Sequence, residues 1–185
     1  MATVVLACDG SDDSLEAARF LAHLPHDDTL HVAVVSVLYV PAKNRNSMSR
    51  EWIDQCMQQE DENARRTFAD VESMFEGANV RLEHVVKEGH VATTIVETAK
   101  ERNADLVVVG ARGRSAVSRV LLGSVSDYVA THAVSSVLVV RPGTSDLGKH
   151  PLRITIAFED TDTAWKGLQQ FCEIDWGRQP TVDLI

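Results

Sequence analysis

The chain has 185 residues, of which 44% are hydrophobic and 24% charged, and its formal net charge is -9. This balance is typical of a globular protein rather than a disordered one, and the length suits one domain of ordinary size with some chain to spare. The acidic charge, without any dense run of lysine or arginine, argues against a nucleic-acid partner.

The cysteines and the apolar segments exclude further classes. Cys8, Cys56 and Cys172 are few and far apart, so they predict neither a disulfide framework nor a zinc site. No segment approaches the roughly 18 apolar residues of a membrane span, and residues 1–10 lack the basic stretch that opens a signal peptide. We therefore expect a cytoplasmic protein that does not interact with a membrane.

Buried strands alternate with helices along the first three quarters of the chain. Valine-rich apolar runs predict the strands, because strands of a parallel sheet are buried on both faces. Apolar side chains at helical spacing predict the helices. The predicted strands are residues 4–8, 30–40, 80–86, 106–109 and 136–140. The predicted helices cover residues 15–22, 51–75 and 91–99, and a fourth begins near Gly123.

This alternation predicts an α/β fold. The alternation implies a five-stranded parallel sheet with helices on both faces and right-handed crossovers. We expect it to be doubly wound and Rossmann-like, and we take 3-2-1-4-5 as its strand order. In such sheets, ligands bind beyond the carboxyl ends of the strands, at the point where the winding reverses. For this order the reversal lies between the first and fourth strands, which lead to Asp9 and Gly110. The sequence therefore predicts a ligand cleft between these two residues.

A glycine-rich loop follows the fourth predicted strand. Gly110, Gly113, Gly123 and Ser124 form the pattern G-x2-G-x9-G-S, and a helix begins at its end. Glycines let the backbone approach a ligand closely, and the free N–H groups of a first helical turn attract an anion. Ser124 with Asp127 also resembles a capping box, which predicts that Ser124 caps this helix. The layout predicts a phosphate site.

This loop resembles the nucleotide-binding motif of universal stress proteins, G-x2-G-x9-G-(S/T), and Asp9, Ser11 and Ser14 resemble the Asp-x-Ser-x-x-Ser pattern of that family. The loop is not a P-loop, because no Gly-Lys-Ser/Thr occurs, and its glycine spacing is wrong for a dinucleotide fingerprint. The resemblance covers residues 3–141 and implies an adenine nucleotide alpha hydrolase-like fold that binds ATP together with Mg²⁺. The nucleotide-binding residues that it implies are Ala7, Cys8, Asp9, Val37, Gly110, Arg112, Gly113, Arg114, Gly123, Ser124 and Val125.

Several of these residues also have a purely structural explanation. Asp9 could accept hydrogen bonds from ribose hydroxyls, or it could merely cap the first helix. Ala7 and Val37 could meet adenine, or they could simply belong to the strand core. Similarly, either phosphate binding or an ordinary surface position would explain the three arginines of the loop region, Arg112, Arg114 and Arg119.

The resemblance implies a regulatory module in which nucleotide occupancy alters contacts with partners. An ATP-hydrolysing enzyme is the alternative, but no general base, Walker-type lysine or carboxylate pair accompanies the loop, so we expect slow hydrolysis at most. A scaffold with an empty pocket is disfavoured, because the glycine motif is complete. The family commonly pairs its fifth strand across an interface, so we expect a homodimer or a tandem pseudo-dimer through Ser136 to Val140.

The end of the chain repeats its beginning. Residues 142–151 have the composition of a linker, and residues 154–162 then match residues 4–12 at a constant offset of 150 positions. The match keeps the apolar strand, the acid at its end and the hydroxyl two residues later.

We expect one domain over residues 1–141, and an incomplete second domain of the same kind, with the order strand, helix, strand, over residues 152–185. A dedicated C-terminal extension is the alternative. Without a complete sheet, the first strand of this unit should cover an edge, pair with another chain or aggregate.

Overall fold

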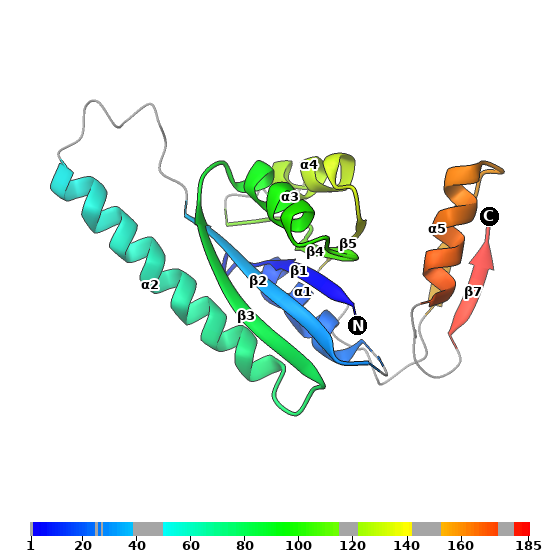
Figure 1. Ribbon diagram of the computed structural model, residues 1–185, viewed down its shortest axis with the longest axis horizontal. Coiled ribbons are helices and arrows are strands. Elements are labelled where there is room, and N and C mark those ends of the chain that lie inside the picture. Colours follow the sequence, from blue (N-terminus) through cyan, green and yellow to red (C-terminus); the bar gives the residue numbers. More distant parts are fainter. Residues whose placement is uncertain are drawn as a thin grey trace.

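The computed structural model describes residues 2–24, 26, 28–38, 50–114, 122–141, 153–173 and 180–185. Arg119 and the predicted linker therefore lie outside the described residues. The elements in chain order (Figure 1) are β1 (Thr3–Ala7), α1 (Asp12–His23), β2 (Leu30–Leu38), α2 (Arg50–Met74), β3 (Val80–Glu88), α3 (Val91–Glu101), β4 (Leu106–Gly110), α4 (Ser124–His132), β5 (Ser136–Val140), β6 (Arg153–Ile156), α5 (Asp162–Glu173) and β7 (Thr181–Leu184).

The first five strands form one parallel sheet in the order β3-β2-β1-β4-β5, which confirms the predicted fold. Because side chains alternate along a strand, β1 contributes to two core layers. Leu6 packs with α1 and α2 on one face, and Val5 packs with α3 and α4 on the other. Both side chains are fully buried, as are Val107 and Val108 of the neighbouring β4. The centre of the sheet is therefore a rigid platform between two helical layers (Figure 1).

Some predicted boundaries differ from the structure by one or two residues. The first strand is Thr3–Ala7 rather than residues 4–8, and the third extends to Glu88 rather than residue 86. The second strand is described to Leu38, and the last two residues predicted for it lie outside the described residues. The prediction that Ser124 caps α4 is wrong, because the cap is Gly123, whose backbone is extended with φ -73° and ψ 162°. The N–H of Gly123 donates to the carbonyl of Ala111 at 2.7 Å, which fixes the chain direction one residue before Ser124. Ser124 is consequently the first helical residue.

The C-terminal elements form a separate two-stranded parallel sheet of β6 and β7, with α5 between them in sequence (Figure 1). Arg153 is paired with Thr181 in this sheet, as Thr3 is paired with His31 in the main sheet, with the same offset of 150 positions in both strands. Helix α5 likewise begins and ends 150 positions after α1. The sequence repeat is therefore also a structural repeat. Its first strand pairs with β7 and does not cover an edge of the main sheet.

No described helix is both long enough and apolar enough to cross a membrane.

Candidate functional site

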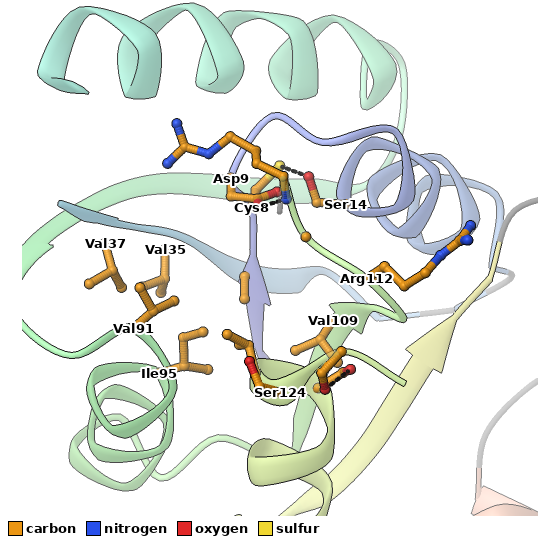
Figure 2. A pocket seen from close by; sticks show the side chains of 17 residues that line it. Cys8, Asp9, Ser14, Val35, Val37, Val91, Ile95, Val109, Arg112 and Ser124 are labelled. Atoms are coloured by element: carbon orange, nitrogen blue, oxygen red, sulfur yellow. Dashed lines mark hydrogen bonds between the residues drawn. The ribbon is translucent and has the colours of Figure 1, made fainter. Parts of the chain in front are cut away.

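A cavity of about 510 Å³ opens at the carboxyl ends of β1 and β4, where the winding of the sheet reverses (Figure 2). Every residue that the sequence predicted for nucleotide binding lines it: Ala7, Cys8, Asp9, Val37, Gly110, Arg112, Gly113, Arg114, Gly123, Ser124 and Val125. The remaining lining residues were not predicted for the site: Ser14, Val35, Val91, Ile95, Val109 and Ser126. The structure therefore brings together the end of β1 and the glycine loop, as expected, and adds a wall from β2 and α3.

Three valines and one isoleucine form an apolar side of the cavity, the valine wall. Val35 and Val37 on the β2 side face Val91 and Ile95 on the α3 side across the cavity (Figure 2). Val35 and Ile95 are 1% and 2% exposed, whereas Val37 and Val91 are half-buried. Partly exposed aliphatic side chains in a concave site suit a flat apolar ring. Sequence analysis assigned α3 only to the core, although its first turn follows β3 at the same edge of the sheet and could have indicated this wall.

Asp9 lies at the polar side of the cavity. Its carboxylate accepts hydrogen bonds from the backbone N–H of Ser11 (3.0 Å), the hydroxyl of Ser11 (2.6 Å) and the backbone N–H of Arg114 (3.1 Å). The cap of α1 is Ser11, whose hydroxyl accepts from the N–H of Ser14 at 3.3 Å, so the alternative that Asp9 caps this helix is wrong.

Asp9 is held as a carboxylate. Burial alone would raise its pKa, but the hydrogen bonds from Ser11 and the backbone of Arg114 outweigh burial and lower the pKa below its ordinary value. An ionised carboxylate has two oxygens with about four lone-pair sites. Three protein donors use part of this capacity, so a ligand hydroxyl can still find an acceptor at Asp9.

Two glycines of the loop are required by the protein's own packing. A Cβ at Gly110 would lie 2.6 Å from the backbone carbonyl carbon of Asp13, in the first turn of α1. A Cβ at Gly113 would lie 2.9 Å from Oδ2 of Asp9. Both separations are far below ordinary contact. At Gly110 the neighbouring atoms are backbone, so the loop can pass this close to α1 only without a side chain there. At Gly113 a side chain would displace the carboxylate of Asp9 from its present position.

The first turn of α4 supplies backbone donors to the cavity. Helix geometry leaves the N–H groups of Ser124, Val125 and Ser126 without acceptors inside the helix, and the macrodipole favours an anion there by roughly 0.3–1 kcal/mol. The hydroxyl of Ser126 is buried and donates to the carbonyls of Ala111 (2.7 Å) and Gly123 (2.9 Å). Ser126, which sequence analysis overlooked, thus fixes the helix start against the glycine loop.

Both arginines of the described loop are held by carboxylates. Arg112 donates from Nε to Asp13 Oδ2 at 3.1 Å and from Nη2 to Asp13 Oδ1 at 3.3 Å, and its side chain points away from the valine wall (Figure 2). Arg114 donates from Nη2 and Nη1 to the two carboxylate oxygens of Glu60 on α2, at 3.0 and 3.4 Å. Each arginine therefore has a protein partner that its local sequence did not reveal.

The lining contains few groups that suit a metal ion. Asp9 is the only carboxylate among the lining residues in the described part of the chain. Within those same described ranges, no group of three or more histidine, cysteine, aspartate or glutamate side chains could hold a metal. A magnesium ion at this cavity would consequently need oxygens from a phosphate ligand, with Asp9 as the nearest protein carboxylate.

Comparison with known proteins identifies relatives of this arrangement. A model described as the universal stress protein family matches residues 1–141. Universal stress protein MJ0531 of Methanocaldococcus jannaschii is 34% identical over 144 residues, which are 75% of this chain and 81% of that protein.

Solved structures share the fold. A universal stress protein from Archaeoglobus fulgidus has a TM-score of 0.69 at 19% identity, and the match covers 98% of this chain and 64% of that chain. A family member from Arabidopsis thaliana, solved with AMP bound, has a TM-score of 0.53 at 17% identity, with 79% of this chain and 95% of that chain covered.

Proposed function

The chain belongs to the universal stress protein family, and from that premise we propose that it is a regulatory module that binds ATP, with Mg²⁺, in the cavity between β1 and β4. The observation that carries this proposal is the convergence of three complementary surfaces on one cavity. An apolar wall, an ionised carboxylate and a helix N-terminus behind a glycine loop line the same space. These match the base, sugar and phosphates of a nucleotide in that order.

Each part of the nucleotide has a proposed partner. The adenine ring lies between the β2 and α3 sides of the valine wall, where aliphatic side chains remove it from water. A ribose hydroxyl donates to Asp9, and the phosphates accept from the backbone N–H groups of Ser124 and Val125. The family member from Arabidopsis was solved with AMP, which supports the view that this fold accommodates an adenine nucleotide.

Mg²⁺ would reduce the repulsion between a triphosphate and this acidic chain. The chain has a net charge of -9, and the cavity itself contains the ionised Asp9. A triphosphate would therefore meet unfavourable electrostatics unless a divalent cation neutralised part of its charge. We propose binding without efficient turnover. Asp9 is the only carboxylate among the described lining residues, and hydrogen bonds from Ser11 and Arg114 lower its pKa, which makes it a weak general base.

Isothermal titration calorimetry of the full chain with ATP, ADP and AMP, each with and without Mg²⁺, tests this proposal. We expect saturable binding of at least one of these nucleotides, and stronger ATP binding when Mg²⁺ is present. Absence of binding by all three would remove the proposed function. A parallel phosphate-release assay separates a binding module from an enzyme, since turnover well above background would favour the latter.

We further propose that β6, α5 and β7 are a degenerate start of a second domain of the same family. The support is the constant offset of 150 positions in helix bounds and strand register. The Archaeoglobus structure, which covers nearly all of this chain and extends beyond it, has a compatible length. Glu159 and Ala164 stand where the first copy has Asp9 and Ser14. We therefore place the nucleotide site in the first domain alone.

The edge strand β5 is the proposed contact to a second copy or to a second domain. Its residues Val137, Leu138 and Val139 are half-buried, whereas the corresponding positions of β4 are almost completely buried. An edge strand with apolar side chains favours pairing with another strand. Sedimentation equilibrium at micromolar concentration would reveal a dimer, and a monomer at all concentrations would argue against pairing between copies.

A further inference from the structure

Two ion pairs, Arg112 with Asp13 and Arg114 with Glu60, hold the arginines of the glycine loop. We propose that Asp13 and Glu60 determine how strongly the site favours nucleotides with more phosphate groups, because they neutralise Arg112 and Arg114. This inference rests on the proposed nucleotide binding and concerns the specificity of that site. Neither carboxylate belongs to the glycine pattern or lines the cavity itself.

The described side chains around the loop carry more negative than positive charge. Among the described side chains there, Arg112 and Arg114 are positive, while Asp9, Asp13 and Glu60 are negative. Each guanidinium faces both oxygens of its carboxylate, a geometry that directs the arginine charge toward the protein. A terminal phosphate near the loop therefore gains little net attraction from these two arginines.

The two ion pairs differ in how readily they can release the arginine. The side chain of Asp13 is only 9% exposed, and its Oδ2 also accepts from the backbone N–H of Arg112 at 3.1 Å. The side chains of Arg114 and Glu60 are 50% and 31% exposed. In the described part of the loop, residues 110–114 and 122–123, the backbone donates no comparable hydrogen bond to Glu60. Exposed ion pairs are weak compared with buried, hydrogen-bonded ones. Glu60 is thus the more dispensable partner, and Arg114 is the arginine that a phosphate could recruit.

The two nucleotides differ in the charge that they bring to the loop. ATP carries more negative charge than AMP, but both carry the same adenosine. Removal of the Glu60 charge should leave contacts with adenosine unchanged and strengthen the attraction for the longer phosphate chain. With two additional ligand charges several ångströms from Arg114 in a solvated site, the gain in affinity for ATP is about fivefold. The gain should diminish at high salt, where such interactions are screened.

The experiment measures dissociation constants of AMP and ATP without divalent cations, for the full chain and two variants. Glu60→Gln removes the partner of Arg114, and Glu62→Gln is its matched control, because Glu62 lies on the same helix and pairs with Arg66 away from the cavity. We expect Glu60→Gln to raise the ratio of ATP affinity to AMP affinity about fivefold, and Glu62→Gln to leave the ratio unchanged. An equal change for both nucleotides, or no change, would overturn the proposal.

A second variant tests the buried pair. Asp13→Asn should raise the same ratio and also lower the melting temperature, whereas Asp12→Asn, an exposed neighbour in the same turn, should do neither. If Asp13→Asn does not fold, Glu60→Gln alone decides the proposal. If the unmodified chain binds neither nucleotide, whether Mg²⁺ is absent or added, the proposed function itself fails, and that outcome is distinguishable from an unchanged ratio in a chain that binds both.

Discussion

The carboxylate of Asp9 accepts a hydrogen bond from the backbone N–H of Arg114 at 3.1 Å, although 105 positions separate the two residues in sequence. This bond joins the end of β1 to the glycine loop after β4, so the polar side of the cavity and its phosphate side form one unit. Because Asp9 also accepts two hydrogen bonds from Ser11, the unit includes the start of α1. A change at Asp9 should consequently affect both the stability of the fold and the shape of the site.

The pH dependence of stability follows from Asp9. Its pKa is lower in the folded chain than in the unfolded chain, since hydrogen bonds from Ser11 and Arg114 favour the carboxylate. The resulting stabilisation is fully present above the unfolded value of about 3.9, and is lost as the pH falls from there through the folded pKa. The free energy of unfolding, measured with urea, should therefore fall more steeply below about pH 4 for the unmodified chain than for Asp9→Asn. Identical pH profiles of the two proteins would contradict this assignment.

A substitution in the valine wall should lower nucleotide affinity without lowering the stability of the fold by much. Val91 is the first residue of α3 and is half-buried in the cavity wall. In Val91→Asp, the new carboxylate interacts favourably with the helix N-terminus by roughly 0.3–1 kcal/mol, which offsets part of the lost apolar packing. The same charge faces the proposed adenine position. Calorimetry should show at least about a tenfold loss of nucleotide affinity, equal to about 1.4 kcal/mol, with only a small change in melting temperature. Unchanged affinity would place the base elsewhere.

Gly110 and Gly167 provide a matched pair of glycine substitutions. A methyl group at Gly110 would meet backbone atoms of Asp13 and Ser14 at 2.6 to 2.7 Å, so Gly110→Ala should lower the free energy of unfolding by about 1–3 kcal/mol. Gly167 lies in α5, and apart from its chain neighbours and the helix's own backbone no described atom lies within 4 Å of the added methyl. Gly167→Ala should therefore be neutral or stabilising by about 0.5–1 kcal/mol. Chemical denaturation measures both. Equal effects would show that loop packing does not require Gly110.

Stoichiometry tests the assignment of the C-terminal elements. If β6, α5 and β7 form a degenerate copy, the chain should bind one nucleotide and not two. The titration endpoint in calorimetry gives this number directly, provided that the active protein concentration is known from an independent measurement. A ratio of two nucleotides per chain would contradict the degenerate second copy.

Sequence patterns were sufficient for the sheet and for part of the site. Continuous valine runs predict a parallel sheet, because its strands are buried on both faces. With the strand order 3-2-1-4-5 taken for this sheet, the positions of Asp9 and Gly110 predict the cavity at the switch point. The partners of Arg112 and Arg114 were not predictable. Asp13 and Glu60 lie 99 and 54 positions away from these arginines, and no local pattern indicates such pairs.

Two further features of the site could not be predicted, because the local sequence has a structural explanation that involves no ligand or tertiary contact. Val35 and Val91 satisfy the strand and helix patterns without any ligand, so their place in the cavity wall emerged only from the packing of α3 against β2. Ser124 has the side chain that a helix cap prefers, but the hydrogen bond from Gly123 to Ala111 moves the cap one residue earlier. Tertiary contacts decided each of these positions.

The most direct test of nucleotide binding is the melting temperature of the full chain with and without Mg²⁺ and ATP. At a ligand concentration of about 100 times Kd, binding stabilises the folded state by about 2.7 kcal/mol. For a chain of this size, this corresponds to an increase of about 5–10 °C. We predict that increase for the unmodified chain, and its loss in Gly113→Val, in which the side chain would press against Asp9. No increase with ATP, ADP or AMP at saturating concentration would contradict the account.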